Sequence, residues 1–183
     1  SVGAVAASDQ DLFDSSLRFE LAAGTSGPFW INATTGELQT THALDREVNA
    51  TYVLHVSCSD QSTAQAARTT TATIVFSVTD ENDNAPYFVQ TPPAAVDVRE
   101  NGAVGEVLAV LHIDDADEGF NGRGGLQVHV VRGGDAVAVA NETRLVTARS
   151  FDFEAVREIE VMVRVSDSGV PSRSVDANLT LVI

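Results

Sequence analysis

The chain repeats itself at a spacing of 106 to 107 residues, and this repeat constrains its fold more than any other feature. Asp9-Gln10-Asp11 reappears as Asp115-Ala116-Asp117. Leu44-Asp45-Arg46-Glu47 reappears as Phe151-Asp152-Phe153-Glu154, and the segment 56–60 reappears at 163–167. Three acidic motifs in one order at one spacing predict two copies of one module within the 183 residues.

Apolar and polar residues alternate between these motifs, which is the pattern of half-buried β-strands. The stripe in the first copy consists of Tyr52, Leu54, Val56 and Cys58, and the stripe in the second consists of Ile159, Val161, Val163 and Val165. A further stripe of Ala72, Ile74, Phe76 and Val78 is matched by Leu179, Leu181 and Ile183. No long segment has helical periodicity, so the pattern predicts antiparallel β-sandwiches.

Two single residues are predicted to be packed. Cys58 lies on an inward stripe, which favours a buried thiol over a redox or intermolecular role. Trp30 follows the turn-forming Gly27-Pro28, which favours packing at a strand start over an exposed docking residue.

The net charge is −15, and all eleven basic residues are Arg. So acidic a surface repels nucleic acid and anionic membranes, and neither is expected as a direct partner. Four glycosylation sequons favour an extracellular chain and start at Asn32, Asn49, Asn141 and Asn178. Because the motifs of both copies are incomplete at their outer ends, we expect an internal piece of a longer protein.

Six consecutive oxygen-bearing side chains fill positions 79–84, followed by Ala85-Pro86. Asp, Glu and Asn offer hard oxygen donors, which suit Ca²⁺ far better than Zn²⁺ or copper. Loops and strand ends gather at the two poles of a sandwich, so tandem modules would bring several carboxylates to one junction. These carboxylates belong to Asp45, Glu47, Glu81, Asp83, Asp115, Asp117 and Asp167.

Two other kinds of site are rejected. An EF-hand loop starting at Asp115 would need Gly at position six and Glu at twelve, where this chain has Phe120 and Leu126. Paired carboxylates could serve glycoside hydrolysis, but these acids repeat by module, as ligands would. No Ser-His-Asp or Cys-His arrangement is identifiable, so an enzyme is not expected.

Taken together, these motifs resemble the extracellular repeats of the cadherin superfamily. The resemblance is carried by Leu-Asp-Arg-Glu, by Asp-x-Asp with Asn-Gly following, by the Asp that ends a strand, and by Asp-Glu-Asn-Asp-Asn-Ala-Pro at 80–86. It implies an all-β fold of two seven-stranded Greek-key sandwiches, the first lacking its N-terminal strand. The expected division is a repeat at 1–80, a calcium-binding linker at 81–86 and a C-terminally trimmed repeat at 87–183.

The resemblance also implies up to three Ca²⁺ ions at the junction. The outermost ion would take Asp45, Glu47 and Asp83, and the second would take Glu47, Asp83, Asp117 and the carbonyl of Glu81. The third would take Asn82, Asp115, Asp117, Asp167 and the carbonyls of Asn84 and Asn121. The first copy lacks the Glu that bridges the first two ions in the family, so those sites are expected to be weak.

Outer half-sites are implied at both ends, where a neighbouring repeat would complete them. They consist of Glu100, Asp152 and Glu154 on one side and of Asp9, Asp11 and Asp60 on the other.

The implied function is Ca²⁺-dependent cell–cell adhesion, with the ions stiffening a rod of repeats. The chain would be an extracellular part of a single-pass plasma-membrane protein, of long or protocadherin-like type. Its partners would be other cadherin ectodomains, bound homophilically or heterophilically. The alternative is a non-adhesive rigid spacer or a heterophilic receptor segment of a large ectodomain.

Overall fold

A computed structural model describes residues 2–9, 16–25, 27–60 and 67–183. The chain divides into two compact units, Ser1–Thr79 and Asp80–Ile183, called unit 1 and unit 2 below. In the described part of the chain, no helix is long and apolar enough to cross a membrane.

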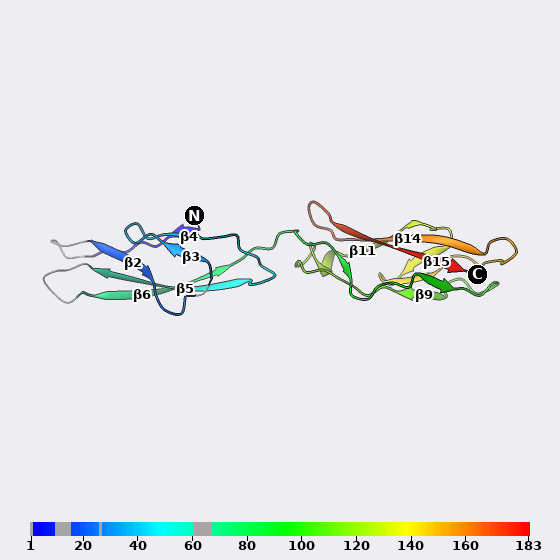
Figure 1. Ribbon diagram of the computed structural model, residues 1–183, viewed down its shortest axis with the longest axis horizontal. Helices are drawn as coiled ribbons and strands as arrows, with labels where there is room; N and C mark the ends of the chain where they lie inside the picture. Colours follow the sequence, from blue (N-terminus) through cyan, green and yellow to red (C-terminus); the bar gives the residue numbers. More distant parts are fainter. Residues whose placement is uncertain (1, 10–15, 26, 61–66) are drawn as a thin grey trace. The chain divides into compact units, whose positions relative to one another are not determined.

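Unit 1 consists of two small antiparallel sheets (Figure 1). One sheet has the order β1-β4-β3, formed by Gly3–Ala4, Glu37–Thr40 and Phe29–Ile31. The other has the order β2-β5-β6, formed by Leu17–Leu21, Thr51–Asp60 and Thr69–Ser77.

The core of unit 1 lies between these sheets and confirms the predicted stripe of β5. Leu54 is fully buried and Val56 is 2% exposed, and they belong to one cluster with Phe29, Ile31 and Leu38 of the opposite sheet. Cys58 is also buried in this cluster, as predicted. Burial, followed by the nearby charge of Asp9, raises the pKa of the Cys58 thiol.

Two side chains of unit 1 differ from the simple alternation. The prediction for Trp30 is wrong, because its side chain lies on the outer face of β3 and is 48% exposed. Ser57 falls on the polar face of β5 but is buried, and its hydroxyl donates to the carbonyl and carboxylate oxygens of Glu20.

Unit 2 repeats this plan with more strands. Its main sheet has the order β11-β14-β15-β8, formed by Gln127–Arg132, Glu158–Ser166, Ser174–Val182 and Ala95–Asp97. The facing sheet has the order β12-β13-β9, formed by Val137–Ala140, Arg144–Thr147 and Val107–Val110. A short pair joins β7 (Tyr87–Phe88) to β10 (Ile113–Asp114), and a 3-10 turn, η1, spans Arg123–Gly125.

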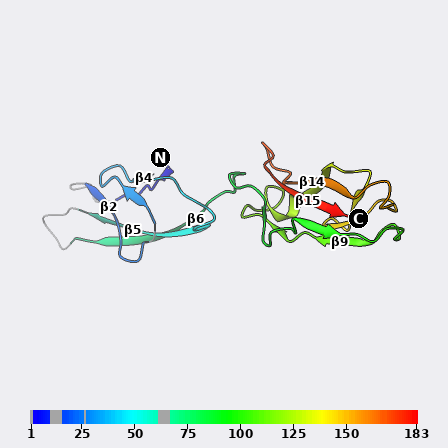
Figure 2. The same ribbon diagram turned by 45° about the vertical axis from the view of Figure 1, so that its right-hand side comes forward.

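The two layers of unit 2 are visible in Figures 1 and 2, with β14 and β15 in one layer and β9 in the other. Val163, Leu181 and Leu145 are fully buried between them. From β11 onward the chain crosses to the facing sheet for β12 and β13 and returns to the main sheet for β14 and β15. The predicted all-β sandwich fold is therefore confirmed.

The last strand is covered differently in the two units. In unit 2, β8 runs parallel to β15, and Thr180 N donates to Ala94 O at 2.9 Å. In unit 1, the described residues place no strand beside the outer edge of β6. Phe76 of β6 is accordingly only partly buried, whereas the matching Leu181 is fully buried.

Candidate metal centre

Three carboxylates are buried at one end of unit 2. Asp115 and Asp117 follow β10 and are 7% and 6% exposed, and Asp167 follows β14 and is 3% exposed. The pKa of Asp115 is raised, mainly by burial and further by the charges of Asp117 and Asp167, while the N–H of Asp117 partly offsets this by donating to it. Buried carboxylates are rare unless something compensates their charge.

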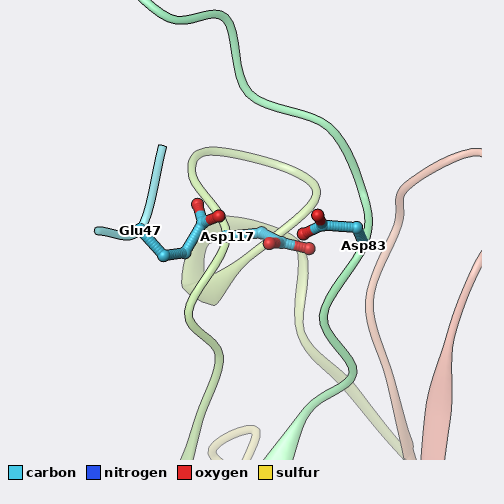
Figure 3. Close-up of side chains that lie close together, drawn as sticks. All are labelled: Glu47, Asp83 and Asp117. Atoms are coloured by element: carbon cyan, nitrogen blue, oxygen red, sulfur yellow. The ribbon is translucent and has the colours of Figure 1, made fainter. Parts of the chain in front are cut away.

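Linker residues bind two of these acids from one side. Asn84 donates its side-chain amide to Asp117 at 2.7 Å and its backbone N–H to the other Asp117 oxygen at 3.1 Å. The same amide donates to Asp83 at 2.8 Å, and carboxylate oxygens of Asp83 and Asp117 lie within 4.8 Å of each other (Figure 3). Asp83 and Asp117 therefore present oxygens to a common point in space.

Asn82 lies against Asp167. Its side-chain nitrogen donates to Asp167 Oδ1 at 3.2 Å and to the carbonyl oxygen of Pro171 at 2.6 Å. Its side-chain oxygen, Asn82 Oδ1, is buried and accepts no hydrogen bond, and the same is true of Asp115 Oδ2. Buried polar atoms in folded proteins are nearly always satisfied, so two oxygens without a partner among buried carboxylates fit the binding of a cation.

The donor set of this end of unit 2 consists of carboxylate, amide and carbonyl oxygens only. Hard oxygen ligands of this kind match Ca²⁺, which accepts six to eight of them in flexible geometry. The residues present thus fit the ion that the sequence predicts, and their chemistry offers neither sulfur nor imidazole to a softer metal.

Asp80 is a functional residue that the sequence analysis missed. Its two carboxylate oxygens accept from the N–H of Glu118 at 3.1 Å and from the side-chain amide of Asn121 at 2.8 Å. Asp80 thereby fixes the loop whose Asn121 carbonyl is an expected ligand. The position of Asp80 at the start of the acidic run indicated a role at this site. The sequence could not distinguish a metal ligand from a residue that holds the loop by hydrogen bonds.

The expected ligands of unit 1 lie on the turn that precedes β5. Asp45 caps this turn, because one of its carboxylate oxygens accepts the N–H of Val48 at 3.0 Å. Glu47 forms an ion pair with Arg46 at 2.8 Å. Both acids are exposed, so they remain available as ligands. The expected carbonyl ligand of Glu81 accepts the N–H of Asp83 at 2.9 Å and retains a second lone pair.

The two outer half-sites differ in how much of their geometry the structure describes. Oxygens of Glu100, Asp152 and Glu154 lie within 4.8 Å of one another, and Glu100 also accepts the N–H of Phe153. At the other end, Asp9 is half-buried, and Asp60 accepts the N–H of Arg68 at 2.9 Å. Asp11 lies outside the described residues.

The four sequons occupy different settings. Asn141 is exposed in a tight turn, with φ of 48°, and Asn178 is exposed on β15. Asn32 and Asn49 are half-buried, and the side-chain oxygen of Asn32 accepts the N–H groups of Thr34 and Thr35. Asn141 and Asn178 are therefore the more accessible acceptor positions.

Comparison with known proteins gives a consistent result across the chain. The Cadherin domain family model matches residues 1–79. Protocadherin-16 of Rattus norvegicus is 37% identical over 168 residues, which cover 91% of this chain but only 5% of that relative. The protocadherin GammaB4 extracellular domain superimposes with a TM-score of 0.86 at 24% identity, over 99% of this chain and 31% of that structure. For mouse cadherin-23 EC22-24, the TM-score is 0.79 at 26% identity, over 92% of this chain and 52% of that structure.

The raised pKa of Asp115 sets the sign of a pH effect. A carboxyl whose pKa is raised by folding stabilises the fold fully below its ordinary pKa of 3.8, and this contribution is lost as the pH rises through the raised value. We expect Asp115→Asn to melt higher than the wild type in chelator near neutral pH, and to lack this component of the pH dependence. Melting curves in chelator between about pH 3 and pH 7 measure it. The exposed Asp97→Asn is the matched control; equal curves for the two variants would contradict the assignment.

The role of Asp80 as a loop anchor can be tested by exchanging donor and acceptor. Asp80→Asn places an amide against the amide of Asn121, and we expect a loss of about 1 kcal/mol and faster exchange of the Glu118 N–H. Adding Asn121→Asp restores a donor–acceptor pair and should recover both properties. Urea unfolding and hydrogen exchange give the two readouts. A double variant no better than the single one would show that Asp80 does not act through this bond.

Proposed function

Because the chain belongs to the cadherin superfamily and consists of its extracellular repeats, we propose that it is a segment of a Ca²⁺-dependent cell-adhesion ectodomain, with Ca²⁺ bound at its linker. One observation carries the proposal: Asn82 Oδ1 and Asp115 Oδ2 are buried without a hydrogen-bond partner, among three buried carboxylates. A cation bound there satisfies both oxygens and neutralises the carboxylates.

The proposed ligands come from both units. Those of unit 2 are Glu81 and Asn84 by their carbonyls, Asn82, Asp83, Asp115, Asp117 and Asp167 by their side chains, and Asn121 by its carbonyl. Unit 1 contributes Asp45 and Glu47. Up to three ions bind at these ligands.

The proposed mechanism is electrostatic stiffening of the linker. Without a cation, the carboxylates of the linker and of the adjoining loops repel one another across a few ångströms. Extracellular Ca²⁺ modules bind at about 10⁻⁴ to 10⁻³ M, so at a few times this concentration each ion contributes about 1 kcal/mol. This is small compared with the stability of a sandwich, but it is sufficient to select one conformation of a linker.

The chain spans 5% of the length of the rat relative. We propose that the parent molecule is a plasma-membrane protein that crosses the membrane once. Its proposed partners are other cadherin ectodomains.

Binding and stiffening can be tested together with Asp83→Ala. We expect calorimetry of the wild type to show Ca²⁺ binding at about 10⁻⁴ to 10⁻³ M, and small-angle scattering to show a longer, stiffer particle with Ca²⁺ than with EDTA. Asp83→Ala should lose the cooperative binding and the stiffening. Its melting curve in EDTA should match that of the wild type, which shows that both units remain folded. Asp97→Ala, which removes an exposed carboxylate from β8, should behave like the wild type. A variant that still binds cooperatively would disprove this ligand assignment.

An adhesive segment and a non-adhesive spacer are expected to differ in Ca²⁺-dependent self-association. An adhesive segment should form dimers, or aggregate coated beads, when Ca²⁺ is present and not in EDTA. A spacer should sediment as a monomer in both. We expect Ca²⁺-dependent association of coated beads; monomeric behaviour at all concentrations in Ca²⁺ would favour the spacer.

A further inference from the structure

Asn82 is held by bonds that need no metal. Its side-chain nitrogen donates to Pro171 O and Asp167 Oδ1, and its backbone carbonyl accepts from Arg173 Nε at 2.7 Å. The loop 167–173 therefore grips both the side chain and the main chain of this one linker residue.

Arg173 is itself fixed to the acid at the start of the loop. Its backbone N–H donates to both carboxylate oxygens of Asp167, at 3.0 and 3.1 Å, and its carbonyl accepts the N–H of Asp167 at 3.1 Å. The backbone of Arg173 is thus bound to Asp167, an expected ligand, while its guanidinium reaches Asn82. The loop also packs closely against Asn82, because a Cβ atom at Gly169 would overlap the side chain of Asn82.

These contacts decide which way the amide of Asn82 points. Pro171 O and the Asp167 carboxylate can only accept, so they require the NH₂ group of Asn82 on their side. The amide oxygen must then lie on the opposite side, where it is buried and has no partner. Holding the backbone of Asn82 therefore aims a free oxygen at the position proposed for the cation.

We propose that Arg173 is a positioning residue of the calcium linker: its Nε–H holds the Asn82 carbonyl, so that the Asn82 side-chain oxygen is aimed before any ion binds. This inference rests on the proposed function. It adds to the site a positively charged residue, which a search for cation ligands would not select. The side chain is exposed, so water screens its repulsion of the ion. The hydrogen bond consequently outweighs the charge.

A panel of variants separates the hydrogen bond from the charge. In Arg173→Gln, the amide nitrogen occupies the place of Nε, so the donor is kept and the charge is lost. Arg173→Lys keeps the charge but moves the donor one bond outward, and Arg173→Met removes both. Arg132→Met is the matched control, because it removes an exposed arginine that pairs with Glu160 on another face of unit 2.

The expected result is that Gln and the control match the wild type, whereas Met and Lys lower the calorimetric Ca²⁺ affinity by about tenfold, as loss of a ligand-orienting contact does. A second readout uses the metal-free protein: in EDTA, the side-chain amide protons of Asn82 should exchange faster in the Met and Lys variants only. Wild-type affinity in Arg173→Met, or an Arg173→Gln variant as weak as Met, would overturn the inference and leave the Ca²⁺ proposal standing. A wild-type protein that binds no Ca²⁺ would overturn both.

Discussion

Like charge crowded at one end of a sandwich is the constraint on which the loops and the linker at that end of unit 2 depend. Asp115, Asp117 and Asp167 are placed there by the ends of β10 and β14, where the chain must leave the sheet. Amide groups of Asn82 and Asn84 satisfy some of their oxygens, but neutral donors do not cancel net charge. Burial and the charges of Asp117 and Asp167 accordingly raise the pKa of Asp115, so this end of unit 2 favours the protonated form of that carboxyl.

The hydrophobic cores do not share this dependence. Each unit has its own buried cluster, and neither cluster contains any of the carboxylates. Fully buried residues such as Leu54, Leu145 and Leu181 contribute a stability that cations do not alter. The cores therefore stabilise each unit without a cation, and under the proposed function a weakly bound ion would act mainly on the linker end.

The linker forms hydrogen bonds with unit 2 that do not depend on a metal ion. Asp80 fixes the loop at 118–121, Asn84 binds Asp117, and Asn82 is held by Arg173 and its loop. Each of these bonds removes conformational freedom that an ion would otherwise have to remove on binding. The linker end of unit 2 is therefore largely ordered by the protein's own hydrogen bonds.

Much of this molecule was determined by local sequence. Alternation specified the inward faces of β5 and β14, and the run of hard oxygen donors indicated the metal class, because each of these is read from near neighbours. The repeat at 106 to 107 residues specified two modules. The burial of Ser57, the exposure of Trp30 and the roles of Asp80 and Arg173 were decided only by tertiary structure. Arg173 and Asn82 are 91 positions apart, and no periodicity indicates which arginine meets which carbonyl. A strand pattern fixes which face a side chain lies on, whereas the path of a loop fixes what it touches.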